Sequence, residues 1–265
     1  LQQLHSRVHD GPGHQLAPGP IAVEFRGLTF GYKEEEPVLH DVSFRLESGR
    51  ILGLLGRTGS GKTTIARLLF RLYDPQSGEI RLGDGDIRQA TLPALRNQVG
   101  MVTQSVQLFR ATIRDNLTFF DSQLADDHIL HTIEDIGLLP WYEKQPDGLD
   151  TQLQSGGQGL SAGQAQLLTF VRVFLKDPGL VILDEATSRL DPATEGMIER
   201  AIDKLLARCT AIIIAHRLAT VQRADDILIL DEGRVHEHGR RCDLEIDRNS
   251  RFSELLRTGL TEVLS

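Results

Sequence analysis

Short, uninterrupted apolar runs recur along the centre of the chain, and each has the length of a strand. Because their side chains do not alternate between apolar and polar, both faces of these strands should be buried, as they are in a parallel sheet. The runs occupy residues 50–56, 99–104, 179–184, 210–216 and 226–231.

Helical patterns separate these runs, notably at 61–71, 162–176 and 192–206. Strands that alternate with helices predict an α/β fold with a central, mostly parallel sheet. The long interval 105–175 also carries helical patterns. It predicts an α-helical subdomain that is inserted between two of the strands.

The first part of the chain has a different pattern. Apolar residues stand at near-alternate positions over 21–32 and again over 38–46, which predicts an antiparallel β lobe. Residues 1–20 end in a Gly- and Pro-rich stretch and predict a linker. The sequence starts with Leu rather than Met, so we expect a fragment of a longer chain, in which this linker follows a further domain. Residues 241–265 predict a helical tail.

Composition narrows the classes of function. The 265 residues carry a formal net charge of −8, which argues against a surface that follows nucleic acid. Cys209 and Cys242 are too few for a disulfide framework and favour a reducing compartment. No apolar run approaches the roughly 18 residues of a membrane span, and the N-terminus lacks the layout of a signal peptide. By itself, this chain cannot carry a solute across a bilayer.

A phosphate-binding loop follows the first central strand. Residues 56–63, with the sequence GRTGSGKT, match the pattern G-x-x-x-x-G-K-[ST] of P-loop nucleotide hydrolases at every fixed position. Glycines let the backbone form a ring of inward N–H groups, and the following helix adds the positive end of its dipole. We expect Lys62 to reach the β- and γ-phosphates of ATP and Thr63 to ligate Mg²⁺. The residues predicted to hold the nucleotide here are Gly56, Arg57, Thr58, Gly59, Ser60, Gly61, Lys62, Thr63 and Thr64.

Two acidic residues end a later strand. Asp184 and Glu185 directly follow the apolar residues 180–183. Ligands of parallel sheets bind at the carboxyl ends of the strands, so both acids should lie beside the phosphate loop. Asp184 is predicted to hold Mg²⁺, directly or through water, and Glu185 to activate the attacking water as a general base.

A short segment rich in small residues precedes the same strand. Residues 160–164 have the sequence LSAGQ, in which Ser161 suits the N-cap of the following helix and Gly163 adds to a possible anion site. The segment closely resembles the LSGGQ signature of ATP-binding cassette (ABC) proteins. Residues 155–158 have the sequence SGGQ, but they lack the preceding Leu and lie six residues earlier. We therefore place the signature at 160–164.

Further matches follow the motif order of the ABC family across residues 21–240. By this resemblance, Tyr32 corresponds to the aromatic residue that stacks on adenine. Gln104 corresponds to the Q-loop glutamine that senses Mg²⁺ and the attacking water. Asp191 ends a segment, SRLD, that is similar to the D-loop at the dimer interface, and His216 corresponds to the switch histidine at the γ-phosphate.

The resemblance implies an ATPase that works with partners. Such domains pair head to tail, so Ser161, Gly163 and Gln164 of one copy would close over the ATP of the other. The expected partners are a second ABC ATPase domain, identical or different, and a transmembrane permease domain. The resemblance places this chain at the cytoplasmic face of the cell membrane. The linker, the single cassette and residues 105–117 are similar to those of exporters.

Two departures from the family pattern leave alternatives open. Ala162 replaces the first glycine of the signature, which adds one methyl group. Residues 151–157 (TQLQSGG) replace a TxVGERG-like segment that contacts the membrane domain in exporters, so the coupling contact or the exporter assignment is in question. A subunit that binds ATP without hydrolysis is one alternative, although Glu185 and His216 are present. A non-transport ABC ATPase would carry a long coiled coil, which the sequence lacks. These residues do not identify a transported substrate.

Overall fold

The computed structural model describes residues 8–33, 35–103, 106–184, 192–215 and 218–258. Within them, the chain divides into two compact units. The first contains the described residues of Leu1–Val99, Gly179–Ile182 and Arg208–Ser265. The second contains those of Gly100–Pro178 and Leu183–Ala207.

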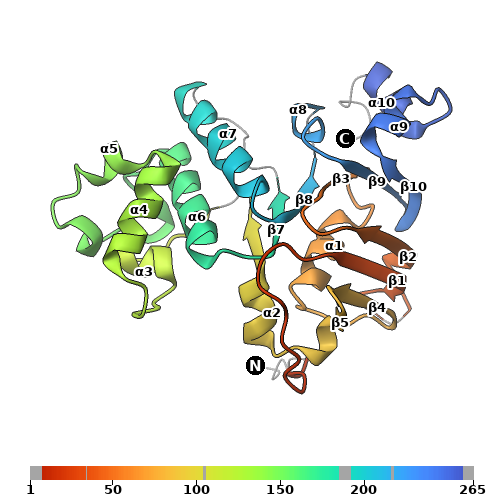
Figure 1. The fold of residues 1–265 in the computed structure, drawn as a ribbon, viewed down its shortest axis with the longest axis horizontal. Helices are drawn as coiled ribbons and strands as arrows, with labels where there is room; N and C mark the ends of the chain where they lie inside the picture. Colours follow the sequence, from red (N-terminus) through yellow and green to blue (C-terminus); the bar gives the residue numbers. More distant parts are fainter. Residues whose placement is uncertain (1–7, 34, 104–105, 185–191, 216–217, 259–265) are drawn as a thin grey trace. The chain divides into compact units, whose positions relative to one another are not determined.

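The described strands form two sheets (Figure 1). One has the order β2-β1-β4-β5, and the other has the order β10-β9-β3-β8-β7-β6. The first sheet consists of β1 (Val23–Phe30), β2 (Leu39–Leu46), β4 (Ser77–Leu82) and β5 (Gly85–Asp86). The second consists of β3 (Ile51–Leu55), β6 (Val99–Val102), β7 (Leu180–Asp184), β8 (Thr210–Ile214), β9 (Asp226–Asp231) and β10 (Arg234–Arg240).

The four-stranded sheet is antiparallel, as its alternating pattern predicts. β1 pairs with β2 and β4 so that Phe25 lies opposite Phe44 on one side and Ile80 on the other. These three side chains are buried, and the rings of Phe25 and Phe44 stack with their centroids 4.6 Å apart. One face of the sheet therefore contributes to the core.

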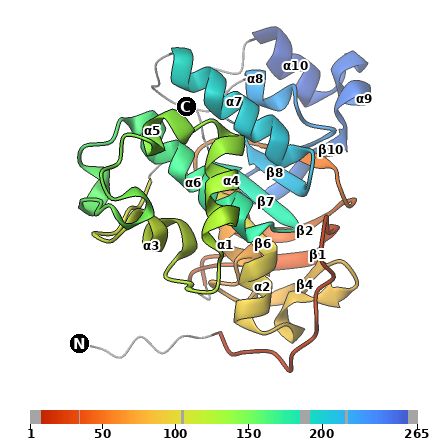
Figure 2. The same cartoon turned by 60° about the vertical axis from the view of Figure 1, so that its left-hand side comes forward.

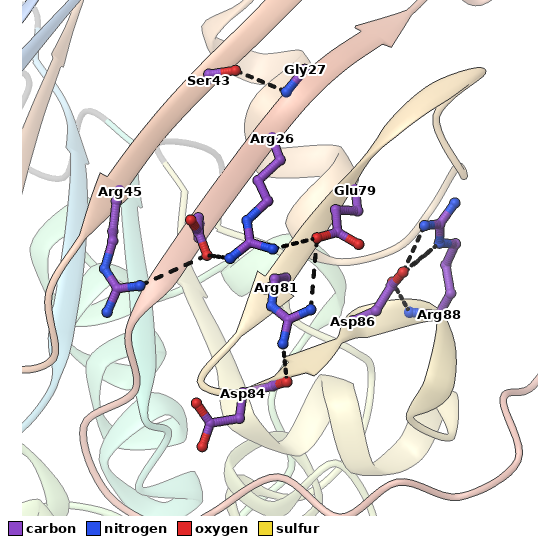
Figure 3. Close-up of polar contacts among 10 residues, drawn as sticks. Arg26, Gly27, Ser43, Arg45, Glu79, Arg81, Asp84, Asp86 and Arg88 are labelled. Atoms are coloured by element: carbon purple, nitrogen blue, oxygen red, sulfur yellow. Dashed lines mark hydrogen bonds and ion pairs between the residues drawn. The ribbon is translucent and has the colours of Figure 1, made fainter.

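The opposite face of this sheet carries alternating charges (Figure 3). Glu24 lies opposite Arg45 and Arg81 in neighbouring strands, and Arg26 lies opposite Glu79. Arg26 donates to Glu24 over 2.7 Å and to Glu79 over 2.9 Å. The hydrogen bond from Arg26 lowers the pKa of Glu24. Because these groups are exposed or only half-buried, their ion pairs add little stability. The pairs favour one cross-strand register instead.

The six-stranded sheet provides the buried parallel strands that the apolar runs predict. β3 is parallel to both β8 and β9, with Leu54 opposite Ile214 and Leu228. Every residue of β8 is buried. β10, which the apolar pattern did not indicate, is antiparallel to β9 and alternates between exposed and half-buried residues.

Several helices accompany the sheets of the first unit. Glu237 of β10 caps the N-terminus of α10. Its carboxylate accepts hydrogen bonds from the backbone N–H groups of Arg251 and Phe252 over 3.0 and 2.9 Å. Phe252 and Leu255 belong to the same buried apolar cluster as Leu55. The helices are α1 (Lys62–Leu69), the 3-10 helix η1 (Ile87–Gln89), α2 (Leu92–Gln98), α8 (Leu218–Val221), α9 (Arg241–Ile246) and α10 (Arg251–Thr258).

Residues 8–20, which the sequence predicts as linker, lie against this first unit. The N–H of His14 donates to the carbonyl of Gln89 over 2.9 Å, and the Asp10 carboxylate accepts from the N–H of Leu92 over 2.7 Å. Val8 is buried. The segment therefore runs beside η1 and the start of α2.

The second unit is built around α6, against which α3, α4 and α7 pack (Figure 2). Lys204 of α7 donates to the Asp135 carboxylate of α4 over 2.8 Å. The helices of this unit are α3 (Ile113–Thr118), α4 (Asp126–Ile136), α5 (Leu139–Tyr142), η2 (Gly148–Asp150), η3 (Ser155–Gly157), α6 (Ala162–Lys176) and α7 (Pro192–Leu206).

The structure confirms the predicted fold class, a mixed α/β fold with an antiparallel lobe and a parallel-rich sheet. Among the described residues, no helix combines the length and the apolar character that crossing a membrane requires. The division into linker, ATPase domain and tail stays a prediction.

Candidate nucleotide-binding site

The phosphate loop joins β3 to α1, and its glycines occupy positions that other residues would not tolerate. Gly56, Gly59 and Gly61 have φ values of 146°, 85° and 108°. A Cβ at Gly56 would overlap the carbonyl oxygen of Leu230, and one at Gly61 would lie 2.5 Å from a methyl of Leu39. The loop therefore needs glycine both for its backbone conformation and for its close approach to β9 and β2.

Lys62 lies inside this loop rather than in solvent. Its side chain is buried, and its Nζ donates to the carbonyl oxygens of Gly56 and Arg57 over 2.6 and 2.9 Å. Ser60 Oγ is also buried and has no hydrogen-bond partner within the described part of the chain. A buried cation, an unsatisfied hydroxyl and the N-terminus of α1 together fit a polyphosphate.

An aromatic side chain lies beside the same helix. The hydroxyl of Tyr32 is 3.2 Å from Thr64 Oγ1, and it accepts a hydrogen bond from Arg67 over 2.8 Å. Tyr32 is 40% exposed, so part of this residue is open to a ligand. The structure thus brings the predicted adenine-stacking residue next to the predicted phosphate loop.

The signature segment begins α6 in the second unit. Ser161 accepts a hydrogen bond from the N–H of Gln164 over 3.1 Å, and Gln164 Oε1 accepts from the N–H of Ser161 over 3.0 Å. This reciprocal pair is a capping box, and it confirms Ser161 as the predicted N-cap. The competing SGGQ segment forms only the short turn η3.

Gly163 has a packing role that the sequence did not reveal. A Cβ at this position would overlap the side chain of Thr194 on α7. The glycine therefore allows α6 and α7 to approach closely. This steric requirement exists whether or not Gly163 also contacts a nucleotide.

Arg172 is a buried cation within α6 that the sequence analysis missed. It donates to the carbonyl of Asn116 over 2.6 Å, to the Asn116 side chain over 3.0 Å and to the carbonyl of Gln107 over 2.7 Å. Its guanidinium also lies over the Phe119 ring, 4.9 Å from the centroid. Burial lowers the pKa of Arg172 to about 10, so it remains a cation at neutral pH. The available signal was a single Arg inside an apolar helical pattern.

We expect Arg172→Met to destabilise the chain by about 3 kcal/mol, because the buried acceptors on Asn116 and Gln107 would lose charge-assisted hydrogen bonds. Urea denaturation would measure this change. The matched control is Arg114→Met, which removes an ion pair with Asp126 and Asp150 at the surface and should cost within about 1 kcal/mol. Equal losses in the two variants would contradict a structural role for Arg172.

The structure describes only some of the predicted catalytic and metal-binding residues. Asp184 ends β7 and is partly buried. Gln104, Glu185, Asp191 and His216 lie outside the described residues. Their roles, and the metal set of Thr63, Gln104 and Asp184, stay predictions.

Comparisons with known proteins agree with this geometry. A sequence profile described as "ABC transporter" matches residues 39–188. The chain is 39% identical over 244 residues to a probable multidrug resistance ABC transporter ATP-binding/permease protein, YheH, of Bacillus subtilis, covering 92% of this chain and 36% of that protein. It is 40% identical over 237 residues to an ATP-dependent lipid A-core flippase of Photorhabdus laumondii, covering 89% of this chain and 41% of that protein.

The fold is also similar to that of a solved structure. A bacterial Atm1-family ABC exporter with ATP bound superposes with a TM-score of 0.86 at 34% sequence identity, covering 96% of this chain and 45% of that one. The chain spans about two fifths of the length of the curated relatives it matches. Since the family profile covers more than half of the chain, this protein belongs to the ABC transporter family, and it is similar to the exporters of that family.

Proposed function

We propose that this chain binds and hydrolyses ATP with Mg²⁺ and is the motor domain of an exporter-type ABC transporter. The observation that carries the proposal is the glycine loop that encloses the buried ammonium of Lys62 beside the exposed ring of Tyr32. One nucleotide contains both of the groups that these features suit, a polyphosphate and an aromatic base.

The phosphate loop supplies the electrostatic part of the mechanism. Lys62 exchanges its bonds to Gly56 and Arg57 for phosphate oxygens, so little desolvation is needed when ATP binds. Thr63, Asp184 and Gln104 are the residues that would hold Mg²⁺, and the ion would supply positive charge against the phosphates. Glu185 orients and deprotonates the attacking water, and His216 contacts the γ-phosphate.

We infer that a second ABC ATPase domain completes the site. Ser161 and Gln164 are exposed or half-exposed at the start of α6, where the helix dipole favours an anion. In a head-to-tail pair, this helix start would close over the ATP bound to the other copy. The D-loop residue Asp191 would lie in the same interface.

A permease domain is the proposed second partner. Phe109, Phe119 and Phe120 are 45%, 60% and 59% exposed, and the ring of Phe109 lies 6.3 and 5.9 Å from the other two. Exposed aromatic clusters of this kind mark interaction surfaces. Relatives named ATP-binding/permease protein and flippase are more than twice as long as this chain, which supports a membrane domain elsewhere in the same polypeptide. Such a chain would work at the cytoplasmic face of the membrane.

The test is MgATP hydrolysis by the purified chain as a function of its concentration. We expect phosphate release to rise more steeply than linearly with protein concentration, because each site needs two copies of the chain. We also expect phosphate release to cease when EDTA removes Mg²⁺. A linear dependence would contradict the shared site. ATP binding without any turnover would favour a nucleotide-gated subunit that does not hydrolyse ATP.

A further inference from the structure

The backbone immediately before Tyr32 is held by a glutamine from a distant part of the chain. The N–H of Gly31 donates to Gln76 Oε1 over 2.9 Å, and Gln76 Nε2 donates back to the carbonyl of Gly31 over 2.7 Å. The N–H of Gln76 also donates to the carbonyl of Thr29 over 3.1 Å. One amide side chain thus satisfies both backbone groups of the residue next to the aromatic ring.

Two aromatic rings hold the Tyr32 side chain itself. Tyr73 contacts Tyr32 with centroids 5.2 Å apart and planes at 86°, and Phe30 contacts it at 5.1 Å and 82°. Tyr73 also contacts Phe30 at 5.6 Å. Edge-to-face contacts are a favoured arrangement of aromatic rings, and the two that Tyr32 makes leave its ring little freedom to rotate.

A cation from α1 completes the arrangement. Arg67 donates to the Tyr32 hydroxyl over 2.8 Å, and its guanidinium carbon lies over the ring, 5.7 Å from the centroid. Because Arg67 is exposed, this contact is not explained by burial of a charge. It fixes the outer end of the tyrosine relative to the helix that follows the phosphate loop.

We propose that Gln76, Tyr73 and Arg67 are positioning residues that hold Tyr32 as a preorganised platform for the adenine base. This inference rests on the proposed function, in which the base of ATP stacks on Tyr32. A ring that is already ordered loses little conformational freedom when the base arrives, and nucleotide affinity rises accordingly. The phosphates bind at the phosphate loop and not at Tyr32, so the three residues affect the binding of the base alone.

The test compares the binding of ATP and of inorganic tripolyphosphate to the full chain by isothermal calorimetry, for wild type, Gln76→Ala, Tyr73→Leu and Arg67→Met. Each variant should weaken ATP by about two- to tenfold while tripolyphosphate binding stays unchanged. Tyr73→Phe keeps the ring and should restore the affinity for ATP. Gln123→Ala, a change at an exposed glutamine of the second unit, is the matched control.

The outcomes separate the two proposals. If the wild-type chain binds neither ligand, the proposed ATP site is wrong. If it binds both and the variants weaken ATP and tripolyphosphate equally, or change neither, the positioning role is overturned while the ATP site stands. Failure of Tyr73→Phe to restore ATP affinity would also overturn the role assigned to the Tyr73 ring.

Discussion

Replacing Lys62 with methionine should weaken ATP binding by at least about a hundredfold. Methionine keeps the length and the apolar stem of the side chain but removes the ammonium that lies inside the phosphate loop. Charge-assisted hydrogen bonds contribute about 1.5–3 kcal/mol each, so losing two of them to phosphate oxygens accounts for the expected effect. Equilibrium binding of a fluorescent ATP analogue would measure it.

The control for Lys62→Met is Lys144→Met, which changes an exposed lysine in the second unit. This variant should bind ATP as the wild type does. Because Lys62 also satisfies the carbonyls of Gly56 and Arg57, thermal unfolding should be recorded for both variants. A folded Lys62→Met chain that binds ATP within threefold of wild type would contradict the assigned role of the loop.

Replacing Glu185 with glutamine should lower kcat by about 10²–10⁴-fold, the range that a general base contributes. The residue directly follows Asp184 at the end of β7, and it lies outside the described residues, so its role is predicted from the sequence. Glutamine has the same shape but cannot accept the proton of the attacking water. ATP binding should therefore persist, and the variant should accumulate as an ATP-bound dimer. Phosphate release and size-exclusion chromatography with MgATP would measure the two effects.

The matched control for this substitution is Glu143→Gln, at an exposed position after α5. We expect normal turnover and no trapped dimer. If Glu185→Gln hydrolyses ATP at the wild-type rate, another group activates the water. If turnover is lost but no dimer forms, Glu185 is essential and the head-to-tail closure over two ATP molecules is wrong.

Local periodicity determined most strands and the longest helices of this protein. The helical patterns at 162–176 and 192–206 coincide with α6 and α7, and the apolar run at 226–231 coincides with β9. The phosphate loop was equally predictable, because the glycines, lysine and threonine that define it lie within eight consecutive residues, 56–63.

Elements without a strong local signal were harder to predict. β10, with the sequence RVHEHGR, has few apolar side chains because it is an edge strand whose outward positions face solvent. The order of the strands within each sheet was not predictable either, because strand partners are chosen by packing between distant segments. The roles of Gln104, Asp191 and His216 stay predictions that rest on their place in the order of motifs. The role of Glu185 stays a prediction that rests on its position directly after the strand β7.

Only the tertiary structure decided the contacts between residues that lie far apart in the chain. Gln76 holds the backbone of Gly31, Arg172 satisfies the acceptors around Asn116, and Thr194 occupies the space that a side chain at Gly163 would need. The sequence around each of these residues gives no sign of the partner that it contacts. A periodic pattern indicates which face of an element is buried, but it does not indicate which other element packs against that face. The sequence by itself therefore determined most strands, the longest helices and the phosphate loop, and the fold determined how the surrounding side chains are positioned.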